Sequence, residues 1–172
     1  MSTNLKKIDW TNDVLQNLAQ VDEGAAKFIR EKRVSIGFWK QGAHTSAIWA
    51  PGKRIFFNPK YYSLQTDPKD PLVHSILIHE VRHLQQGIFT ALSVYGELDA
   101  WQLGFRVYHE MTGYPYHPKL VELMSLPLGW DRDVLRRAQV LMQVYAGKSY
   151  RADLLPLYPW GRELKYRLGL LK

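Results

Sequence analysis

Residues 71–87 read Pro-Leu-Val-His-Ser-Ile-Leu-Ile-His-Glu-Val-Arg-His-Leu-Gln-Gln-Gly, and this stretch decides the fold. Its apolar residues recur with the helical period, which predicts a helix with one continuous apolar side. Asp70 and Pro71 have the chemistry of an N-cap and a first-turn proline, and Gly87 that of a stop. The predicted apolar side consists of Leu72, Val73, Ile76, Leu77, Val81 and Leu84. The opposite side consists of His74, Ser75, Arg82, Gln85 and Gln86, and Ile78 is the exception.

The pattern H-E-x-x-H at residues 79–83 lies within that apolar side. Histidines four residues apart share one helix face, so His79 and His83 can both reach one ion at about 2.0 Å. Buried polar groups cost free energy unless they are paired or bind a metal. Glu80 can take a proton from a zinc-bound water and act as the catalytic base. The pattern therefore predicts a Zn²⁺ site, the alternative being chance register on a surface helix.

A catalytic zinc usually has three protein ligands, so a third donor is needed. The chain has no cysteine, which leaves His, Asp or Glu. If residues 93–108 form a helix, Glu97 shares a face with Ala100 and Gly104, whereas Asp99 lies on the opposite face. Small residues at those two positions would let this helix approach the first one closely. We expect Glu97 to be the third ligand.

Other roles are open for both acids. Glu97 could be an acid favoured by the dipole at a helix start. Asp99 could be a surface acid or a hydrogen-bond partner of a ligand histidine.

An H-E-x-x-H helix followed by a helix with Glu-x-x-Ala resembles the gluzincin metallopeptidases. The short forms, the ImmA/IrrE-type peptidases and the minigluzincins, are most similar in length. The resemblance covers about residues 34–111. It implies one zincin-like metallopeptidase domain over residues 1–172, with His79, His83 and Glu97 as zinc ligands and Glu80 as the base. Trp101 stands where relatives often have Asp or Asn, and the fourteen-residue step from His83 to Glu97 requires an abrupt turn across residues 87–93.

The remaining patterns predict an α+β fold. An amphipathic helix is expected over residues 11–33, followed by three strands at 34–40, 44–50 and 54–58 that form a small antiparallel meander. The turns are Gln41-Gly42-Ala43 and Pro51-Gly52-Lys53. Asp131 can cap a helix that runs to Tyr145 and ends at Gly147, and a short basic tail follows. In gluzincin-like folds a strand beside the cleft binds extended peptide, so an edge of this sheet could do so.

Composition predicts a soluble cytoplasmic protein with one core. The 172 residues include no apolar stretch near 18 residues and no signal-peptide core. We therefore expect no membrane partner, and the oligomeric state stays open. Of the net charge of +7, residues 130–172 carry +5, from nine basic and four acidic residues. Nucleic-acid binding by this part should be weak and non-specific, because no base-reading motif is present.

Two functions fit these patterns. The first is a zinc metallopeptidase that acts on a peptide or protein substrate, with the zinc-bound water activated by Glu80. The second is a metal-stabilised regulatory or interaction module without turnover, which binds a partner through its basic C-terminal part. Glu80 favours the enzyme, because a purely structural site has no use for an acid beside the metal. A peptidase also needs a group that stabilises the oxyanion, and the candidates are Tyr95, Tyr108, His109 and His117.

Overall fold

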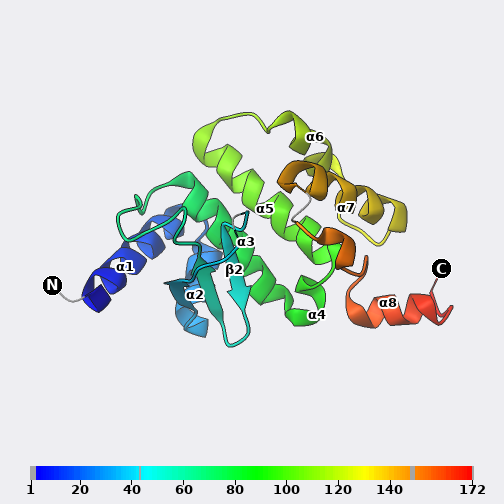
Figure 1. The fold of residues 1–172 in the computed structure, drawn as a ribbon, viewed down its shortest axis with the longest axis horizontal. Helices are drawn as coiled ribbons and strands as arrows, with labels where there is room; N and C mark the ends of the chain where they lie inside the picture. The colour runs from blue at the N-terminus through cyan, green and yellow to red at the C-terminus, as the bar shows by residue number, and fades with distance from the viewer. Residues whose placement is uncertain (1–2, 43, 148–149, 172) are drawn as a thin grey trace. The chain divides into compact units, whose positions relative to one another are not determined.

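The computed structural model describes residues 3–42, 44–147 and 150–171, and within them the predicted α+β class is confirmed (Figure 1). The chain forms two compact units. Unit 1 contains Met1–Val81 and Leu103–Gly113, and unit 2 contains Arg82–Gln102 and Tyr114–Lys172. Two helices, α3 (Pro71–Gln86) and α5 (Val94–Thr112), run from one unit into the other. The expectation of a single domain over residues 1–172 stays a prediction.

The N-terminal helix of unit 1 is broken in two, so the prediction of one helix over residues 11–33 is wrong. α1 covers Thr3–Val21 and α2 covers Glu23–Lys32, and the two pack against each other. Asp22 stands between them with extended backbone, and its carboxylate accepts a hydrogen bond from the Ala25 amide at 2.8 Å. An N-cap inside an amphipathic pattern starts a new helix without changing the apolar period.

The three-stranded sheet has the order β1-β3-β2, with β1 at Ser35–Phe38, β2 at Ala47–Ala50 and β3 at Arg54–Phe57. β2 and β3 form the predicted antiparallel pair, but β1 pairs with β3 in parallel, so the wholly antiparallel meander is wrong. The connection from β1 to β2 is long enough to cross from one edge of β3 to the other. The predicted turn there includes Ala43, which lies outside the described residues.

One face of the sheet packs on α1 and forms the core of unit 1. Ile55 and Phe57 of β3 are fully buried, and the Trp10 ring from α1 lies 6.0 Å from the Phe57 ring and 5.4 Å from the Phe38 ring. The Trp10 indole N–H donates to the carbonyl of Thr66 at 2.9 Å, so burial leaves no orphaned donor on this ring. Phe56 points to the other face, because successive strand residues alternate between faces.

α3 begins and ends as predicted, but it is buried on more sides than its pattern indicates. The Asp70 carboxylate accepts from the Leu72 amide at 2.8 Å, and Gly87 has a φ of 74° just after the last turn. His74 and Ser75, predicted on the polar side, are both buried, whereas Leu72 is exposed. Ser75 is satisfied because its hydroxyl donates to the carbonyl of Gly104 at 2.8 Å.

Gly104 permits a close approach of α5 to α3 within unit 1, as the small residues predicted. A Cβ at this position would lie 3.0 Å from the Ser75 carbonyl oxygen and 3.4 Å from the His79 Cβ. A methyl group at residue 104 would require this contact between α3 and α5 to open by a few tenths of an ångström.

Unit 2 consists of the end of α3, the first half of α5 and four further helices. These are α4 (Ile88–Ala91), α6 (Pro118–Ser125), α7 (Arg132–Ala146) and α8 (Trp160–Arg167), with a 3₁₀ turn at Ala152–Leu154. The predicted cap is confirmed: the Asp131 carboxylate accepts from the Asp133 and Val134 amides, and α7 ends before Gly147. α6 packs against α7, and both helices are labelled in Figure 1.

Many basic side chains of the C-terminal part are engaged inside unit 2. Arg132 and Arg167 each lie 3.1 Å from a carboxylate oxygen of Glu163, and Arg132 also stacks over the Tyr166 ring at 3.9 Å. Burial by itself would raise the pKa of Glu163, but the hydrogen bonds from Arg167 and Arg132 outweigh it and lower that pKa. Arg136, Arg137 and Arg151 pair with Asp133, Glu122 and Asp153. Lys148 and Lys172 lie outside the described residues.

In the described part of the chain, no helix combines the length and the apolar character needed to cross a lipid bilayer.

His74 should make folding sensitive to acid. Its side chain is fully buried, one ring nitrogen donates to the Pro68 carbonyl at 2.9 Å, and the other has no hydrogen-bond partner. Burial lowers its pKa below the ordinary 6.5, against a smaller opposing effect of the Pro68 bond. The unfolded chain therefore takes up the proton more readily, and stability present above pH 6.5 is lost as the pH falls below it.

Urea unfolding at pH 7.5 and 5.5 measures this loss. His74→Leu should reduce the pH dependence of the unfolding free energy, whereas His44→Gln, at an exposed position, should leave it unchanged. An equal pH dependence in wild type and His74→Leu would contradict the prediction.

Candidate metal site

The structure brings the three predicted ligands together. Each of His79, His83 and Glu97 offers one ligand atom, and these atoms all lie within 4.8 Å of one another. The His83 Nε2 and the Glu97 Oε1 are 3.6 Å apart. Two donors of a tetrahedral zinc site with bonds of about 2.0 Å are separated by roughly 3.3 Å, so the 3.6 Å between His83 and Glu97 is close to zinc spacing, and the three side chains together could hold a metal ion. The chemistry of the donor set fits as well, because zinc accepts both nitrogen and oxygen ligands.

A hydrogen bond fixes which nitrogen of His83 faces Glu97. The His83 Nδ1 lies 3.3 Å from the Gln86 Oε1, an atom that can only accept. Nδ1 therefore carries the proton and donates it to Gln86. In the neutral ring Nε2 then carries the lone pair, on the side of Glu97 where a metal would bind. His83 is almost fully buried, with 2% of its side chain exposed, so the ring cannot turn freely in solvent.

Asp99 supports this arrangement through Gln86 instead of facing solvent. The Gln86 side-chain amide donates to the Asp99 Oδ2 at 2.7 Å and to the Gly96 carbonyl at 3.0 Å. Arg82 donates from Nε to the same Asp99 oxygen at 2.7 Å. The prediction that Asp99 projects to solvent is wrong, because only 14% of its side chain is exposed. Asp99 therefore contacts the candidate ligand His83 through Gln86 and not directly.

Glu97 is held by a tyrosine that the sequence analysis missed. The Tyr150 hydroxyl donates a short hydrogen bond to the Glu97 Oε2, and it accepts a hydrogen bond from the Trp101 Nε1 at 2.8 Å. With Oε2 engaged in this way, Oε1 is the oxygen turned toward His83. Tyr150 lies 53 residues after Glu97, and no spacing or periodicity in the sequence connects the two. Trp101, noted only as an unusual residue, donates to the hydroxyl that holds the ligand.

The abrupt turn between α3 and α5 is built from α4 and a glycine. A Cβ at Gly96 would lie 2.1 Å from the Thr90 carbonyl oxygen, so only glycine fits there. The Ser93 hydroxyl donates to the Thr90 carbonyl and accepts from the Gly96 amide at 3.1 Å. Glu97 follows directly, and the predicted turn thus determines where this carboxylate lies.

Glu80 lies in the middle of the H-E-x-x-H segment and is buried, with 6% of the residue exposed. A carboxylate at this position of α3 follows one candidate ligand by one residue and precedes the other by three. It is chemically suited to receive a proton from a water held at the cluster.

Two of the four candidate oxyanion groups make contacts within unit 2. The Tyr95 ring stacks on Trp130 at 4.2 Å, and the His117 Nδ1 accepts from the Lys119 amide at the start of α6. Tyr108 and His109 are half-buried on α5. Tyr150 contacts a predicted ligand, but its single hydroxyl proton is already donated to the Glu97 carboxylate.

Comparison of the chain with protein-family models, with curated proteins and with solved structures gives no match. The case for a function consequently depends on the geometry of the site.

Gly96→Ala should destabilise the protein strongly. The added methyl group would overlap the Thr90 carbonyl, and overpacking of this kind costs about 1–3 kcal/mol. Gly129→Ala is the matched control, because a Cβ there meets nothing within 4 Å and its backbone does not require glycine. Chemical denaturation measures both variants, and equal stability of the two would show that the turn can relax around residue 96.

Proposed function

We propose that this chain is a zinc metallopeptidase of the gluzincin type, short single-domain form. The observation that carries the proposal is the cluster of His79, His83 and Glu97 within 4.8 Å, with Glu80 buried on the same helix as the two histidines. A structural zinc site usually closes its fourth position with a protein ligand, whereas three ligands and an adjacent acid suit hydrolysis. The proposed compartment is the cytoplasm, because a chain without cysteine is compatible with a reducing environment.

In this proposal each side chain has one task. His79, His83 and Glu97 would hold the zinc ion, which would supply a bound water with a pKa lowered to about 7. Glu80 would accept a proton from a water held at the cluster and would deliver that proton to the departing amine. Gln86 keeps the His83 proton on Nδ1, and Tyr150 keeps Glu97 turned. The substrate is a peptide or protein.

The alternative is a metal-stabilised module that binds a partner through its basic C-terminal part. The arginines that would supply that surface are paired with acids or stacked on aromatic rings within unit 2. The paired acids therefore neutralise part of the positive charge of these arginines. No contact of the described residues favours this second function. Weak, salt-sensitive nucleic-acid binding stays a prediction.

The ligand assignment is tested by metal content and affinity. We expect one zinc per chain, and Glu97→Ala should weaken binding more than about 100-fold because it removes a ligand. Asp99→Ala should weaken it by about 100-fold or less, and Tyr150→Phe by about 10-fold, because each acts through another residue. Competition with a chromogenic chelator gives the affinities. A larger loss for Asp99→Ala than for Glu97→Ala would move the ligand to Asp99.

Glu80→Gln separates the base from the ligands. The amide keeps the shape of the side chain but cannot accept the proton, so the variant should bind zinc normally and lose peptide hydrolysis by at least about 100-fold. Turnover of a casein or peptide-library substrate measures the loss. Loss of zinc from this variant would instead mark Glu80 as a ligand, and unchanged turnover would remove it from the mechanism.

A further inference from the structure

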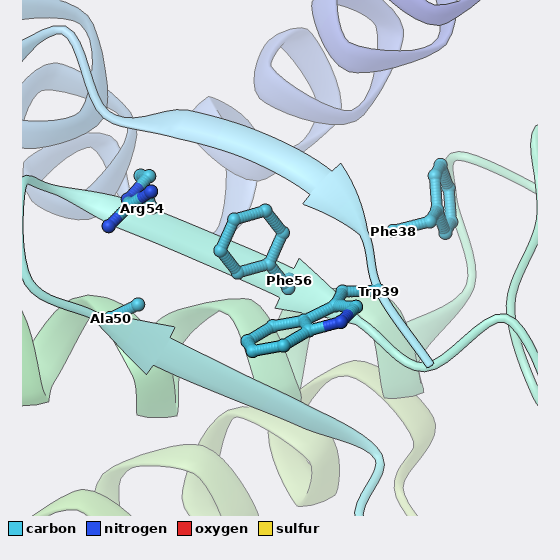
Figure 2. Close-up of a pocket in the computed structure, with 5 residues that line it drawn as sticks. All are labelled: Phe38, Trp39, Ala50, Arg54 and Phe56. Atoms are coloured by element: carbon cyan, nitrogen blue, oxygen red, sulfur yellow. The ribbon is translucent and has the colours of Figure 1, made fainter. Parts of the chain in front are cut away.

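A shallow pocket of about 360 Å³ lies on the sheet of unit 1, and Figure 2 shows the residues that line it. They are Phe38 and Trp39 at the end of β1, Ala50 of β2, and Arg54 and Phe56 of β3. Phe56 lies in the middle, with Arg54 on one side and Trp39 and Phe38 on the other. The wall is therefore almost wholly apolar, with one cation at its end.

One ring of this pocket is largely exposed, and the other two are half-buried. Trp39 has 58% of its surface exposed, although it packs edge to face on Phe56 with centroids 5.7 Å apart and planes at 76°. Two rings at such an angle form a corner that can take one bulky side chain. They do not form the parallel slot that a flat nucleobase would need for stacking on both of its faces.

A second cation reaches the same face. A Cβ built on Gly37 would lie 3.4 Å from the Lys7 ammonium nitrogen and 3.4 Å from the Phe56 ring, so Lys7 extends from α1 to the surface beside Phe56. Lys7 is only half exposed. Within the described residues, neither Lys7 nor Arg54 takes part in an ion pair, although Arg54 donates from Nε to the Pro51 carbonyl at 3.0 Å.

The segment that forms the sheet contains no acid that could neutralise these cations. Residues 32–66 include six Lys or Arg and no Asp or Glu. Since the C-terminal arginines are largely paired with acids, the absence of acids makes this segment a concentrated source of positive charge. Its field would attract anionic groups and raise their local concentration.

We infer that this sheet face binds an extended acidic peptide segment, in which one bulky apolar side chain enters the corner of Trp39 and Phe56 and flanking carboxylates meet Arg54 and Lys7. Apolar burial supplies affinity, and the two cations supply selectivity for acidic flanks. The inference rests on the proposed peptidase function only in so far as the bound segment belongs to the substrate.

The test uses the Glu80→Gln protein, so that bound peptide is not cleaved. Fluorescence anisotropy measures binding of a fluorescein-labelled peptide with Glu-Phe-Glu between Gly-Ser flanks, and of matched peptides with Gln-Phe-Gln, Lys-Phe-Lys and Glu-Ala-Glu. The first should bind at least about 10-fold more tightly than each of the others. Arg54→Gln and Lys7→Gln should each weaken its binding by about 3- to 10-fold, as expected for partly exposed charge pairs.

Lys53→Gln is the matched control, since it removes a neighbouring exposed cation outside the pocket. An equal loss of peptide affinity in Lys53→Gln would show that the effect is non-specific electrostatic attraction, and this result would overturn the inference. Equal binding of the Glu-Ala-Glu peptide would do the same, because the aromatic corner would then have no role. Tighter binding of a ten-nucleotide oligo-dT or of phosphatidylserine vesicles through Arg54 and Lys7 would assign the surface to another partner.

Peptide binding needs no turnover, so its outcome is separate from that of the proposed function. If the wild-type protein neither binds zinc nor cleaves peptides but the acidic peptide still binds, the proposed peptidase function is wrong and the proposed peptide-binding surface is supported. If peptides are cleaved without any preference for Glu-Phe-Glu and without an effect of Arg54→Gln, the proposed peptidase function is supported and the proposed peptide-binding surface is wrong.

Discussion

The close packing of α5 against α3 is the constraint on which the candidate site depends. The two helices are so close at Gly104 that a Cβ on this residue would lie 3.0 Å from the Ser75 carbonyl oxygen. The Ser75 hydroxyl also donates a hydrogen bond to the Gly104 carbonyl of α5. Near the other end of α3, Gln86 donates to the Gly96 carbonyl and to Asp99. A carboxylate arm is short, so Glu97 can share an ion with histidines of α3 only if the helices keep this spacing.

The sequence predicts the parts of this arrangement that follow from local chemistry. The helical period locates α3 and α5, Gly87 ends the first, and the face shared with Ala100 and Gly104 selects Glu97 instead of Asp99. Contacts over long stretches of sequence are different. Tyr150 reaches Glu97 from a segment 53 residues later, and its position depends on how α7 and the following turn fold back. No pattern along a single chain contains that information.

The errors in the fold have the same origin. The predicted pairing of β1 is wrong because each strand pattern gives the faces of a strand but not its neighbours. The sequence does not reveal the break at Asp22, because an N-cap can interrupt an amphipathic helix while the apolar residues stay in register. The helical period predicts a polar side for His74, yet His74 is fully buried, because the period does not say how many elements will pack around a helix.

The distribution of ion pairs shows why the count of basic residues alone does not locate the surface that would attract an anionic partner. The C-terminal part holds most of the formal positive charge, but Glu163 alone accepts from Arg132 and Arg167, and further arginines pair with acids close by. The sheet segment has fewer basic residues and contains no acid, and its Arg54 makes no ion pair with the described residues. An ion pair that stabilises the fold lowers the field outside it, whereas an unpaired cation beside an exposed ring keeps its field. The strongest electrostatic attraction for an anionic partner is therefore expected where the cations lack acids, and in this protein that place is the outer face of the sheet.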